Sequence, residues 1–351
     1  MIITNRYPRI LKPYEAIGGL RVNRYTFLTN PFHYLISGRV DLFFAWFFFK
    51  PVTLIRLIID FIRFKPKVVN LHFPDHQLLE CYLLMQLFRF ELIISLHGNE
   101  VERMRTLSKR SLKYYLYNKL FISSIKITGC SQYLLDQFHI LFPHLNRNKY
   151  MPQHNGVSSK FSEQTLFVQK NNNIFSAARF VPKKGLDLLY KATQPSIGNN
   201  LLIAGGDEND FSTLGLKKRE GIILLGSLSQ GELAKHLACA KLTVIPSKKE
   251  PFGIIVAEAL CCGSPVVATN VGGIPEVVFL AKEQLDHIEK EIFDSWIILT
   301  EPNVESINNG IDSLLNNNGS IKDYLNLVPK FRNNFLWSTR LNKFRTILAE
   351  L

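Results

Sequence analysis

The feature of the chain that most restricts its fold is a series of short β-branched runs separated by segments of helical character. Several runs, such as LLIA at 201–204 and IILL at 222–225, are apolar at every position. Continuous apolar strands are typical of a parallel sheet covered by helices on both faces. The intervening helical segments therefore predict right-handed βαβ units. The expected strands cover 2–4, 68–72, 92–96, 125–129, 174–178, 201–204, 222–225, 242–245, 265–268 and 296–299.

The length and the position of one polar stretch predict two domains. At roughly 150 residues per domain, 351 residues suggest two, and an apolar content of 46% supports a packed core in each. The stretch 158–173 ends in three asparagines before a new strand and is expected to be the linker. We expect α/β domains over 1–157 and 158–332. Residues 333–351 are expected to form a helix that packs back on the first domain.

Cysteine usage and the N-terminus indicate a cytoplasmic protein. The five cysteines are odd in number and form no CxxC pair, which is typical of buried thiols in a reducing compartment. The first ten residues contain no basic-then-apolar signal pattern. The cysteines are Cys81, Cys130, Cys239, Cys261 and Cys262.

The positive charge of the chain is confined to its first part. Residues 1–160 contain 22 Lys and Arg against 9 Asp and Glu, whereas residues 161–351 contain 20 of each. Such asymmetry predicts a polyanionic partner. No nucleic-acid module is recognisable, so nucleic acid is not expected. Two basic, aromatic segments, 42–67 and 101–121, favour an anionic membrane surface instead.

No membrane-spanning helix is expected in the apolar run LFFAWFFF at 42–49. Charged residues and a proline interrupt the pattern well before the ~20 apolar residues that a span requires. We therefore expect these segments to lie on a bilayer surface. The interrupting residues are Lys50, Pro51, Arg56 and Asp60.

The stretch 242–278 carries the clearest binding signal. It is expected to form a strand, a loop over 246–253 and a helix over 254–262. In open α/β sheets this end of a parallel strand is where ligands bind. The free amides of Gly253, Ile254 and Ile255 suit a phosphate or a sugar hydroxyl. Glu250 in the loop and Glu258 in the helix are expected to bind two ends of one ligand.

A second cluster follows the strand at 174–178. Arg179 comes directly after this strand, and Lys184 precedes Gly185 and a helix. Both cations are expected at the carboxyl end of the sheet, where they suit phosphate oxygens. Lys183 is expected to point to solvent.

These residues together resemble glycosyltransferase family 4, the retaining GT-B enzymes that use nucleotide sugars. Glu250-PFGIIVA-Glu258 matches the E-x7-E pattern of the family, and GGIPEVV at 272–278 also fits. Arg179 and Lys184-Gly185 match its Arg and Lys-Gly positions, with Ala178 where Gly is usual. Looser matches before residue 160 are Gly18-Gly19, LHG at 96–98, Ser131 and NGV at 155–157. The implied fold is GT-B, with two doubly wound Rossmann-like domains that face a central cleft.

The resemblance implies a role for each matched residue. Glu258 would hold the ribose hydroxyls, while Arg179 and Lys184 would neutralise the departing diphosphate. Glu250 and the backbone of Phe252, Gly253 and Ile254 would hold the transferred sugar, next to Ile255. His97 would face the donor sugar from the first domain. Gly18 and Gly19 would allow close approach to the phosphates.

The expected activity is transfer of a hexose-like sugar from a nucleotide-sugar donor, with retention and without a metal. UDP-sugars are preferred over GDP-sugars as donors, and no further cofactor is expected. The acceptor is expected to be a lipid-linked, lipopolysaccharide or capsule-type saccharide at the inner face of the cell membrane. Two alternatives remain open: a non-catalytic nucleotide-sugar-binding protein and a GT-B nucleotide-sugar epimerase.

Overall fold

The computed structural model describes residues 1–5, 12–27, 31–166, 168–193 and 200–349. The chain divides into two compact units, the first over 1–128 and 137–151 and the second over 129–136 and 152–351. The division differs from the predicted boundary at 157/158. The stretch expected as a linker packs on the second unit, because Phe161 is fully buried and Lys170 donates hydrogen bonds to the carbonyls of Ala238 and Gly263.

The second unit is built on a six-stranded sheet in the order β10-β9-β8-β11-β12-β13. All its strands are parallel, and each lies within one residue of its predicted bounds. Strands β11 and β12 are buried along their whole length, as expected for a parallel sheet covered on both faces. The strands are β8 (Ile174–Ala177), β9 (Leu201–Ala204), β10 (Ile222–Gly226), β11 (Leu242–Ile245), β12 (Val266–Thr269) and β13 (Ile297–Thr300).

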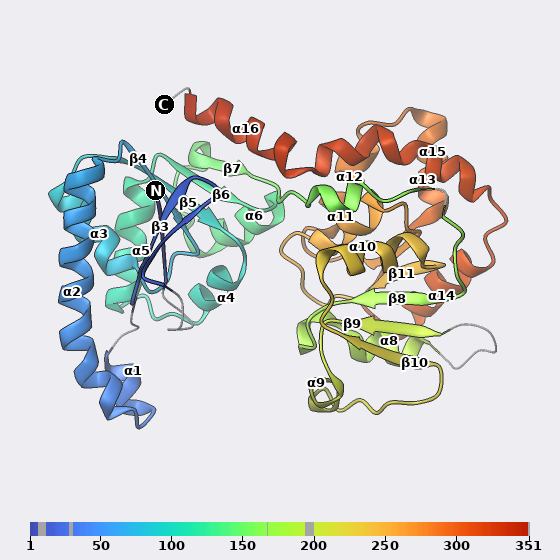
Figure 1. Cartoon of the computed structure of the whole chain (residues 1–351), viewed down its shortest axis with the longest axis horizontal. Coiled ribbons are helices and arrows are strands. Elements are labelled where there is room, and N and C mark those ends of the chain that lie inside the picture. Colours follow the sequence, from blue (N-terminus) through green and yellow to red (C-terminus); the bar gives the residue numbers. More distant parts are fainter. Residues whose placement is uncertain (6–11, 28–30, 167, 194–199, 350–351) are drawn as a thin grey trace. The chain divides into compact units, whose positions relative to one another are not determined.

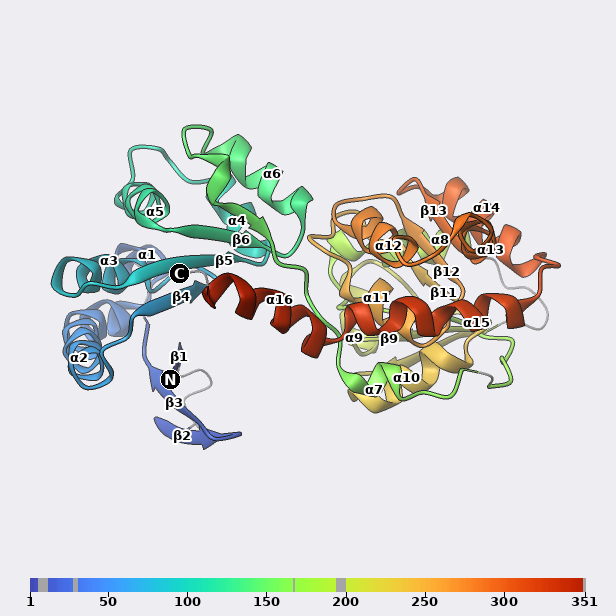
Figure 2. The same cartoon turned by 90° about the horizontal axis from the view of Figure 1, so that it is seen from above.

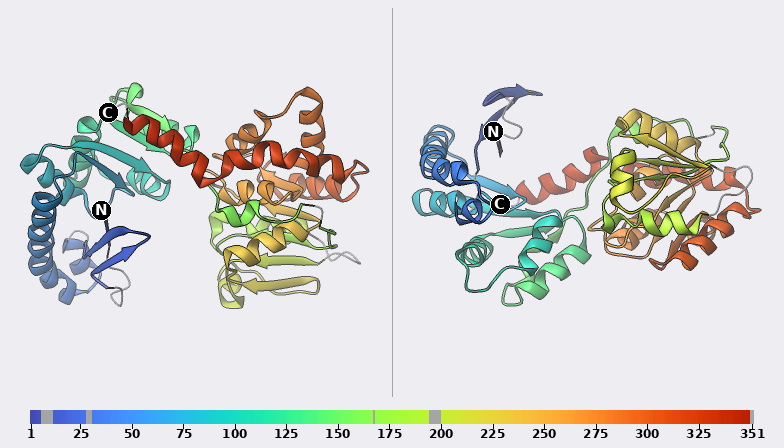
Figure 3. Two further views of the ribbon diagram at one scale, coloured as in Figure 1. Left: turned by 45° about the horizontal axis from the view of Figure 1, so that its top comes forward. Right: turned by 90° about the horizontal axis from the view of Figure 1, so that it is seen from below.

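Helices cover both faces of this sheet, as Figures 2 and 3 show. Helices α8 (Leu186–Ala192) and α14 (Val304–Leu315) pack together on one face, and α10 (Gln230–Cys239) and α11 (Ile254–Cys261) pack on the other. A capping box between Ser229 and Glu232 starts α10. The other elements are α7 (Ser159–Ser162), η2 (Pro182–Lys184), α9 (Glu208–Thr213), α12 (Ile274–Lys282), α13 (His287–Trp296), α15 (Ile321–Arg332), η3 (Asn333–Phe335) and α16 (Trp337–Ala349).

The final helix was predicted over 333–351, and α16 confirms a helix there. Its packing on the first domain stays a prediction.

The first unit contains two smaller sheets (Figure 1). One has the order β4-β5-β6-β7 and the other β1-β3-β2. The strands are β1 (Ile2–Asn5), β2 (Tyr14–Ile17), β3 (Leu20–Tyr25), β4 (Val68–His72), β5 (Glu91–Leu96), β6 (Lys126–Gly129) and β7 (Tyr150–Pro152). The helices are α1 (Pro31–Ile36), α2 (Val40–Phe64), α3 (Leu78–Leu87), α4 (Asn99–Arg105), α5 (Leu112–Ser123), α6 (Gln132–Leu141) and η1 (Arg147–Lys149).

Helix α2 continues through the charged residues and the proline that interrupt its apolar run. Its 25 residues run through Lys50, Pro51, Arg56 and Asp60. Lys50 and Asp60 lie on the buried side, where each has a partner. The Lys50 ammonium is 2.6 Å from the Glu80 carboxylate, and Asp60 accepts hydrogen bonds from Asn23 and Tyr25. Charges that face inward and are paired do not break a helix.

The opposite side of α2 is apolar and exposed. Its exposed side chains include Phe44 and Phe48, each 67% exposed, and Ile55 and Ile62, each 56% exposed. By length and composition, α2 is the only helix in the described ranges that could cross a membrane. The charged residues in the apolar run at 42–67 predict no such helix, so α2 differs from the prediction by this measure.

Candidate functional site

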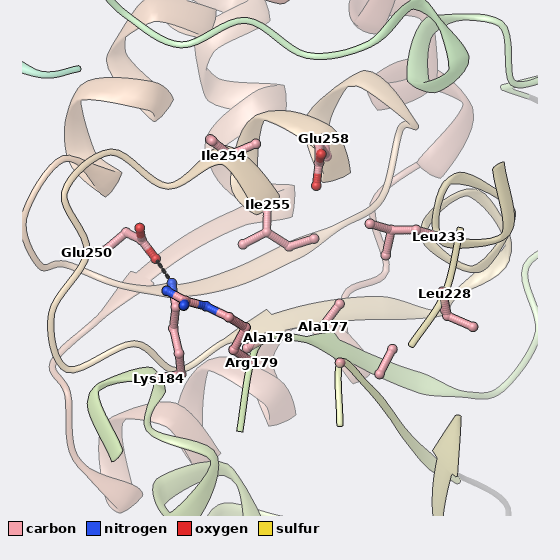
Figure 4. Close-up of a pocket in the computed structure, with 12 residues that line it drawn as sticks. Ala177, Ala178, Arg179, Lys184, Leu228, Leu233, Glu250, Ile254, Ile255 and Glu258 are labelled. Carbon is pink, nitrogen blue, oxygen red and sulfur yellow. Dashed lines mark hydrogen bonds and ion pairs between the residues drawn. The ribbon is translucent and has the colours of Figure 1, made fainter. Parts of the chain in front are cut away.

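A pocket of about 340 Å³ lies in the second unit at the carboxyl end of its sheet (Figure 4). The loops after β8, β9 and β11 and the start of α11 form its walls, which is where an open α/β sheet binds ligands. Six of the predicted site residues line it. They are Arg179, Lys184, Glu250, Ile254, Ile255 and Glu258, together with Ala177, Ala178, Ala204, Gly205, Leu228 and Leu233.

Glu250 and Lys184 form an ion pair at one end of the pocket. The Lys184 Nζ lies 2.6 Å from the Glu250 Oε2, and Ser247 donates a second hydrogen bond to the same oxygen at 3.4 Å. Both side chains are largely buried, at 17% and 9% exposure. The sequence placed these residues in one site but did not predict that they bind each other. The pair holds the ammonium in place without a ligand.

Arg179 lies beside this pair. Its side chain extends toward Lys184 and Glu250 from the end of β8 (Figure 4), and it is exposed. Two cations against one nearby carboxylate leave this end of the pocket net positive, which favours an anionic ligand. Lys183, expected to point to solvent, is only half-exposed.

Glu258 lies at a different part of the pocket, with Ile254 and Ile255 between it and Glu250 (Figure 4). Both carboxylates line the pocket, and their binding of two ends of one ligand stays a prediction. Burial raises the pKa of the Glu258 carboxyl to about 7. A ligand hydroxyl that donates a hydrogen bond to this carboxylate would favour its ionised form.

The raised pKa of Glu258 predicts a specific pH dependence of stability. Because the folded-state pKa lies above the unfolded one, the folded state binds more protons, and the free energy of unfolding falls as pH rises from about 4.5 to about 7. At about 1.4 kcal/mol per unit of pKa, the loss is on the order of 2–3 kcal/mol. In Glu258→Gln this part of the loss should disappear. Urea unfolding of both proteins at pH 5 and pH 8 measures it, and equal pH dependence in the two would contradict the assignment.

The loop before α11 and the segment that contacts it each contain a glycine with a positive φ, Gly253 and Gly272. Gly253, the residue before the helix, has a φ of +103°, and Phe252 is buried with 2% exposure. The first N–H groups of the helix have no intrahelical acceptor. Gly272 has a φ of +61°, and a Cβ there would overlap the Glu250 carbonyl oxygen. The neighbouring Gly273 N–H donates to that oxygen at 2.9 Å.

Four residues outside the predicted site form a cluster of contacts next to the loop over 246–253. Ser131 donates a hydrogen bond to the Pro251 carbonyl at 2.5 Å, and the His154 ring stacks on Phe252 with centroids 5.8 Å apart. The Nε2 of His154 lies 2.5 Å from the Glu276 carboxylate, which also accepts from the Gln132 amide.

The hydrogen bonds that Glu276 accepts favour its ionised form. Burial opposes ionisation, but the hydrogen bonds from His154 and the backbone outweigh it and lower the pKa of the carboxyl. Of this cluster, the sequence analysis singled out only Ser131. Two of the other residues lie in or beside sequence motifs that could have identified them. Glu276 belongs to the matched GGIPEVV motif, and His154 directly precedes NGV.

His97 lies in the first unit directly after β5, with His72 as its neighbour. The His72 Nδ1 and the His97 Nε2 are 3.0 Å apart, and Phe73 stacks on His97 with centroids 3.9 Å apart. Burial lowers the pKa of both imidazoles to about 4, so both are neutral at pH 7. The contact with His72 was not predicted from the sequence, although His72 ends β4, the strand that pairs with β5. The place of His97 near a donor sugar stays a prediction.

Gly18 and Gly19 form the turn between β2 and β3 in the first unit. Their φ values of +56° and +79° are those of a two-residue hairpin turn, which favours glycine at both positions. A Cβ at either position would meet open space. The positive φ values of the turn are sufficient to explain why glycine occupies both positions. The approach of these glycines to phosphates stays a prediction.

The described architecture is the GT-B fold, with parallel Rossmann-like α/β units. Solved structures share it at low sequence identity. Sucrose-phosphate synthase from Thermosynechococcus elongatus aligns with a TM-score of 0.69 at 16% identity, over 99% of this chain and 89% of its own. Anabaena Alr3699/HepE in complex with UDP aligns at 0.67 and 17% identity, over 94% and 86%.

The chain belongs to the family of glycosyl transferases group 1, whose family model matches residues 157–333. Among curated relatives, uncharacterized glycosyltransferase MJ1178 of Methanocaldococcus jannaschii is 32% identical, over 53% of this chain and 51% of its own. A GDP-mannose-dependent monoacylated alpha-(1-6)-phosphatidylinositol monomannoside mannosyltransferase of Corynebacterium glutamicum is 30% identical, over 54% of each chain. The matched regions span about half of these relatives.

Proposed function

We propose that the chain is a retaining, metal-independent glycosyltransferase of the family 4 type that uses a nucleotide diphosphate sugar. The observation that supports this most directly is the pocket that brings Arg179, Lys184, Glu250 and Glu258 together. It offers cations for a diphosphate and separate carboxylates for the hydroxyls of a ribose and a sugar. The family membership supports glycosyl transfer.

In the proposed reaction, an acceptor hydroxyl oxygen bonds to the anomeric carbon while the bond from that carbon to the diphosphate breaks. The electron pair of this bond leaves with the diphosphate, which also takes up the hydroxyl proton. Arg179 and Lys184 would stabilise the charge that develops on the diphosphate oxygens, which is where preset cations lower a barrier most effectively. Glu250 and the first amides of α11 would hold the sugar, and His97 would face it.

We propose a UDP-sugar as the donor, in preference to a GDP-sugar. Solved relatives of the same fold include complexes with UDP and with UDP-glucose. One curated relative is named for its use of GDP-mannose instead. The base would lie toward Leu228 and Leu233, at the opposite side of the pocket from Glu250 (Figure 4).

We propose a saccharide or lipid-linked acceptor, bound by the first unit at the inner, cytoplasmic face of the cell membrane. Helix α2 supports a membrane contact, because Lys50 and Asp60 are buried and paired while Phe44, Phe48, Ile55 and Ile62 face outward. A helix with this arrangement is suited to lie in the boundary between headgroups and acyl chains. The positive charge of residues 1–160 suits an anionic bilayer surface.

The donor site is tested by thermal unfolding of wild type and Arg179→Ala with UDP, GDP, ADP, CMP and the corresponding sugars. A ligand at about 100 times its dissociation constant should stabilise the fold by about 2.7 kcal/mol. We expect this shift with UDP and a UDP-sugar in wild type. We expect it to be largely lost in Arg179→Ala, because one of the two diphosphate-binding cations is removed.

Product analysis completes the test. Transfer with retention, unchanged by EDTA, would agree with the proposal. Nucleotide binding without sugar transfer to any saccharide or lipid-linked acceptor would point to a non-catalytic binding protein. No shift with any nucleotide would contradict the assignment of the pocket.

A further inference from the structure

A second pocket, in the first unit, is lined by three arginines. It has a volume of about 400 Å³ and lies between the β2–β3 hairpin and α2. Its arginines come from both elements, and only one carboxylate accompanies them. The lining residues are Tyr14, Arg21, Arg56, Ile59, Asp60 and Arg63.

The single carboxylate, Asp60, is already engaged. It is 5% exposed and accepts hydrogen bonds from Asn23 and Tyr25. Arg21 lies 3.5 Å from it and completes its environment. Neither Arg56 nor Arg63 has a carboxylate within ion-pair distance in the described part of the chain. Two positive charges at this pocket are therefore uncompensated.

Arg56 is held in place by aromatic contacts. Its guanidinium lies over the rings of Tyr14 and Tyr25, at 5.3 and 4.9 Å from their centroids. It also donates a hydrogen bond to the Tyr14 hydroxyl at 2.6 Å. A guanidinium that is already ordered loses little conformational freedom when its remaining N–H groups bind a ligand. Its planar donors match the oxygens of a phosphate.

The pocket borders the exposed apolar side of α2. Ile59 lines the pocket and is itself 39% exposed, and Ile55 and Ile62 lie one turn away on the same helix at 56% exposure each. An anion-binding pocket beside an apolar surface has the arrangement of a lipid with its phosphate next to its acyl chains.

We propose that Arg56 and Arg63, with Arg21, form a binding site for the phosphate of a membrane lipid. The inference rests on the proposed membrane contact of α2 and adds the group that the first unit would bind there. The same chemistry would accept the phosphate of a soluble sugar phosphate. The apolar border favours the lipid-borne phosphate.

The test is flotation of the full chain with vesicles of phosphatidylcholine alone or with phosphatidic acid added. The double variant Arg56→Gln/Arg63→Gln removes the two uncompensated charges. The control Arg89→Gln/Arg147→Gln makes the same charge change at exposed positions of the first unit outside this pocket. At about 1 kcal/mol per cation near a membrane surface, the first pair should weaken binding to phosphatidic acid vesicles by roughly 10- to 30-fold. The control pair should change it by about twofold or less.

Two further measurements distinguish loss of the apolar contact from loss of the phosphate site. Phe44→Ser/Phe48→Ser should lose binding to every vesicle, because it removes apolar area from α2. Inorganic phosphate at constant ionic strength should compete only weakly with phosphatidic acid vesicles. Equal losses in the two arginine pairs would overturn the site, since net charge alone would then explain binding. Stabilisation by inorganic phosphate that depends on Arg56 and Arg63, without vesicle binding, would overturn the lipid in favour of a soluble phosphate.

The outcome is distinguishable from failure of the proposed transfer reaction. Arg56 and Arg63 do not line the pocket proposed for the donor, so stabilisation by UDP should be the same in wild type and in the Arg56→Gln/Arg63→Gln variant. If wild type binds UDP but no vesicle, the membrane contact and the lipid site are both wrong, and the donor assignment stands. A variant that unfolds at a lower temperature than the control pair is compared at 10 °C, where both are folded.

Discussion

Replacing Lys184 by alanine should lower the turnover of the sugar-transfer reaction by about 10²–10³-fold. The ammonium lies in the pocket proposed for the donor and is held 2.6 Å from Glu250. Its positive charge would be most valuable when the diphosphate departs, so the loss should fall mainly on kcat. The measurement is the steady-state rate at saturating donor.

A second variant and a control make this prediction specific. Lys184→Ala leaves the buried Glu250 carboxylate without its cation, which can also lower stability. Lys184→Gln keeps a donor for Glu250 without the charge, and it should lose turnover to a similar extent. Lys248→Ala removes a nearby lysine that pairs with Asp187 at 2.7 Å and does not line the pocket. Its turnover should stay within about twofold of wild type. Wild-type turnover in both Lys184 variants would remove this residue from the catalytic site.

Replacing Gly272 by alanine should lower kcat/KM for the donor by about 10²-fold and also destabilise the fold. The φ of +61° disfavours any side chain, at a cost of roughly 1–2 kcal/mol. The new Cβ would also overlap the Glu250 carbonyl oxygen, so the loop that carries Glu250 must move. A displacement of about 1 Å in a positioning group can cost this much in rate.

Gly231 provides the matched control for this substitution. It lies in the first turn of α10 without a positive φ, and a Cβ there meets nothing within 4 Å. Gly231→Ala should leave kcat/KM unchanged and stabilise the protein by roughly 0.5–1 kcal/mol. Thermal unfolding and donor kinetics of both variants give the comparison. Similar kinetics for Gly272→Ala and wild type would show that the position of the loop does not matter for the reaction.

The sequence predicted the second unit closely because its signals are local. Strand β9 is apolar at every position, and β11 and β12 are apolar at all but one. Gly253 precedes the first residue of α11, and Gly263 follows its end. Glu250 and Glu258 belong to one short motif, so their placement at two parts of one pocket followed from a strand, a loop and a helix.

Contacts between distant segments could not be predicted in the same way. The partners of Asp60 come from β3, and the partner of Lys50 comes from α3. These pairings turn the charges of α2 inward, whereas the sequence showed only charges that interrupt an apolar run. The bond between His154 and Glu276 joins residues 122 positions apart. Neither residue carries a pattern that identifies the other.

The division of the chain has a consequence for engineering and for the evolution of such proteins. Residues 129–136 belong to the second unit although the chain returns to the first unit after them. A fragment that starts at residue 152 would lack Ser131 and Gln132, leaving the Pro251 carbonyl and the Glu276 carboxylate without these donors. The chain therefore cannot be exchanged between relatives as two contiguous halves joined at residue 152. A chimera should therefore carry 129–136 together with its own residues 152–351, which restricts the positions at which two related chains can be joined.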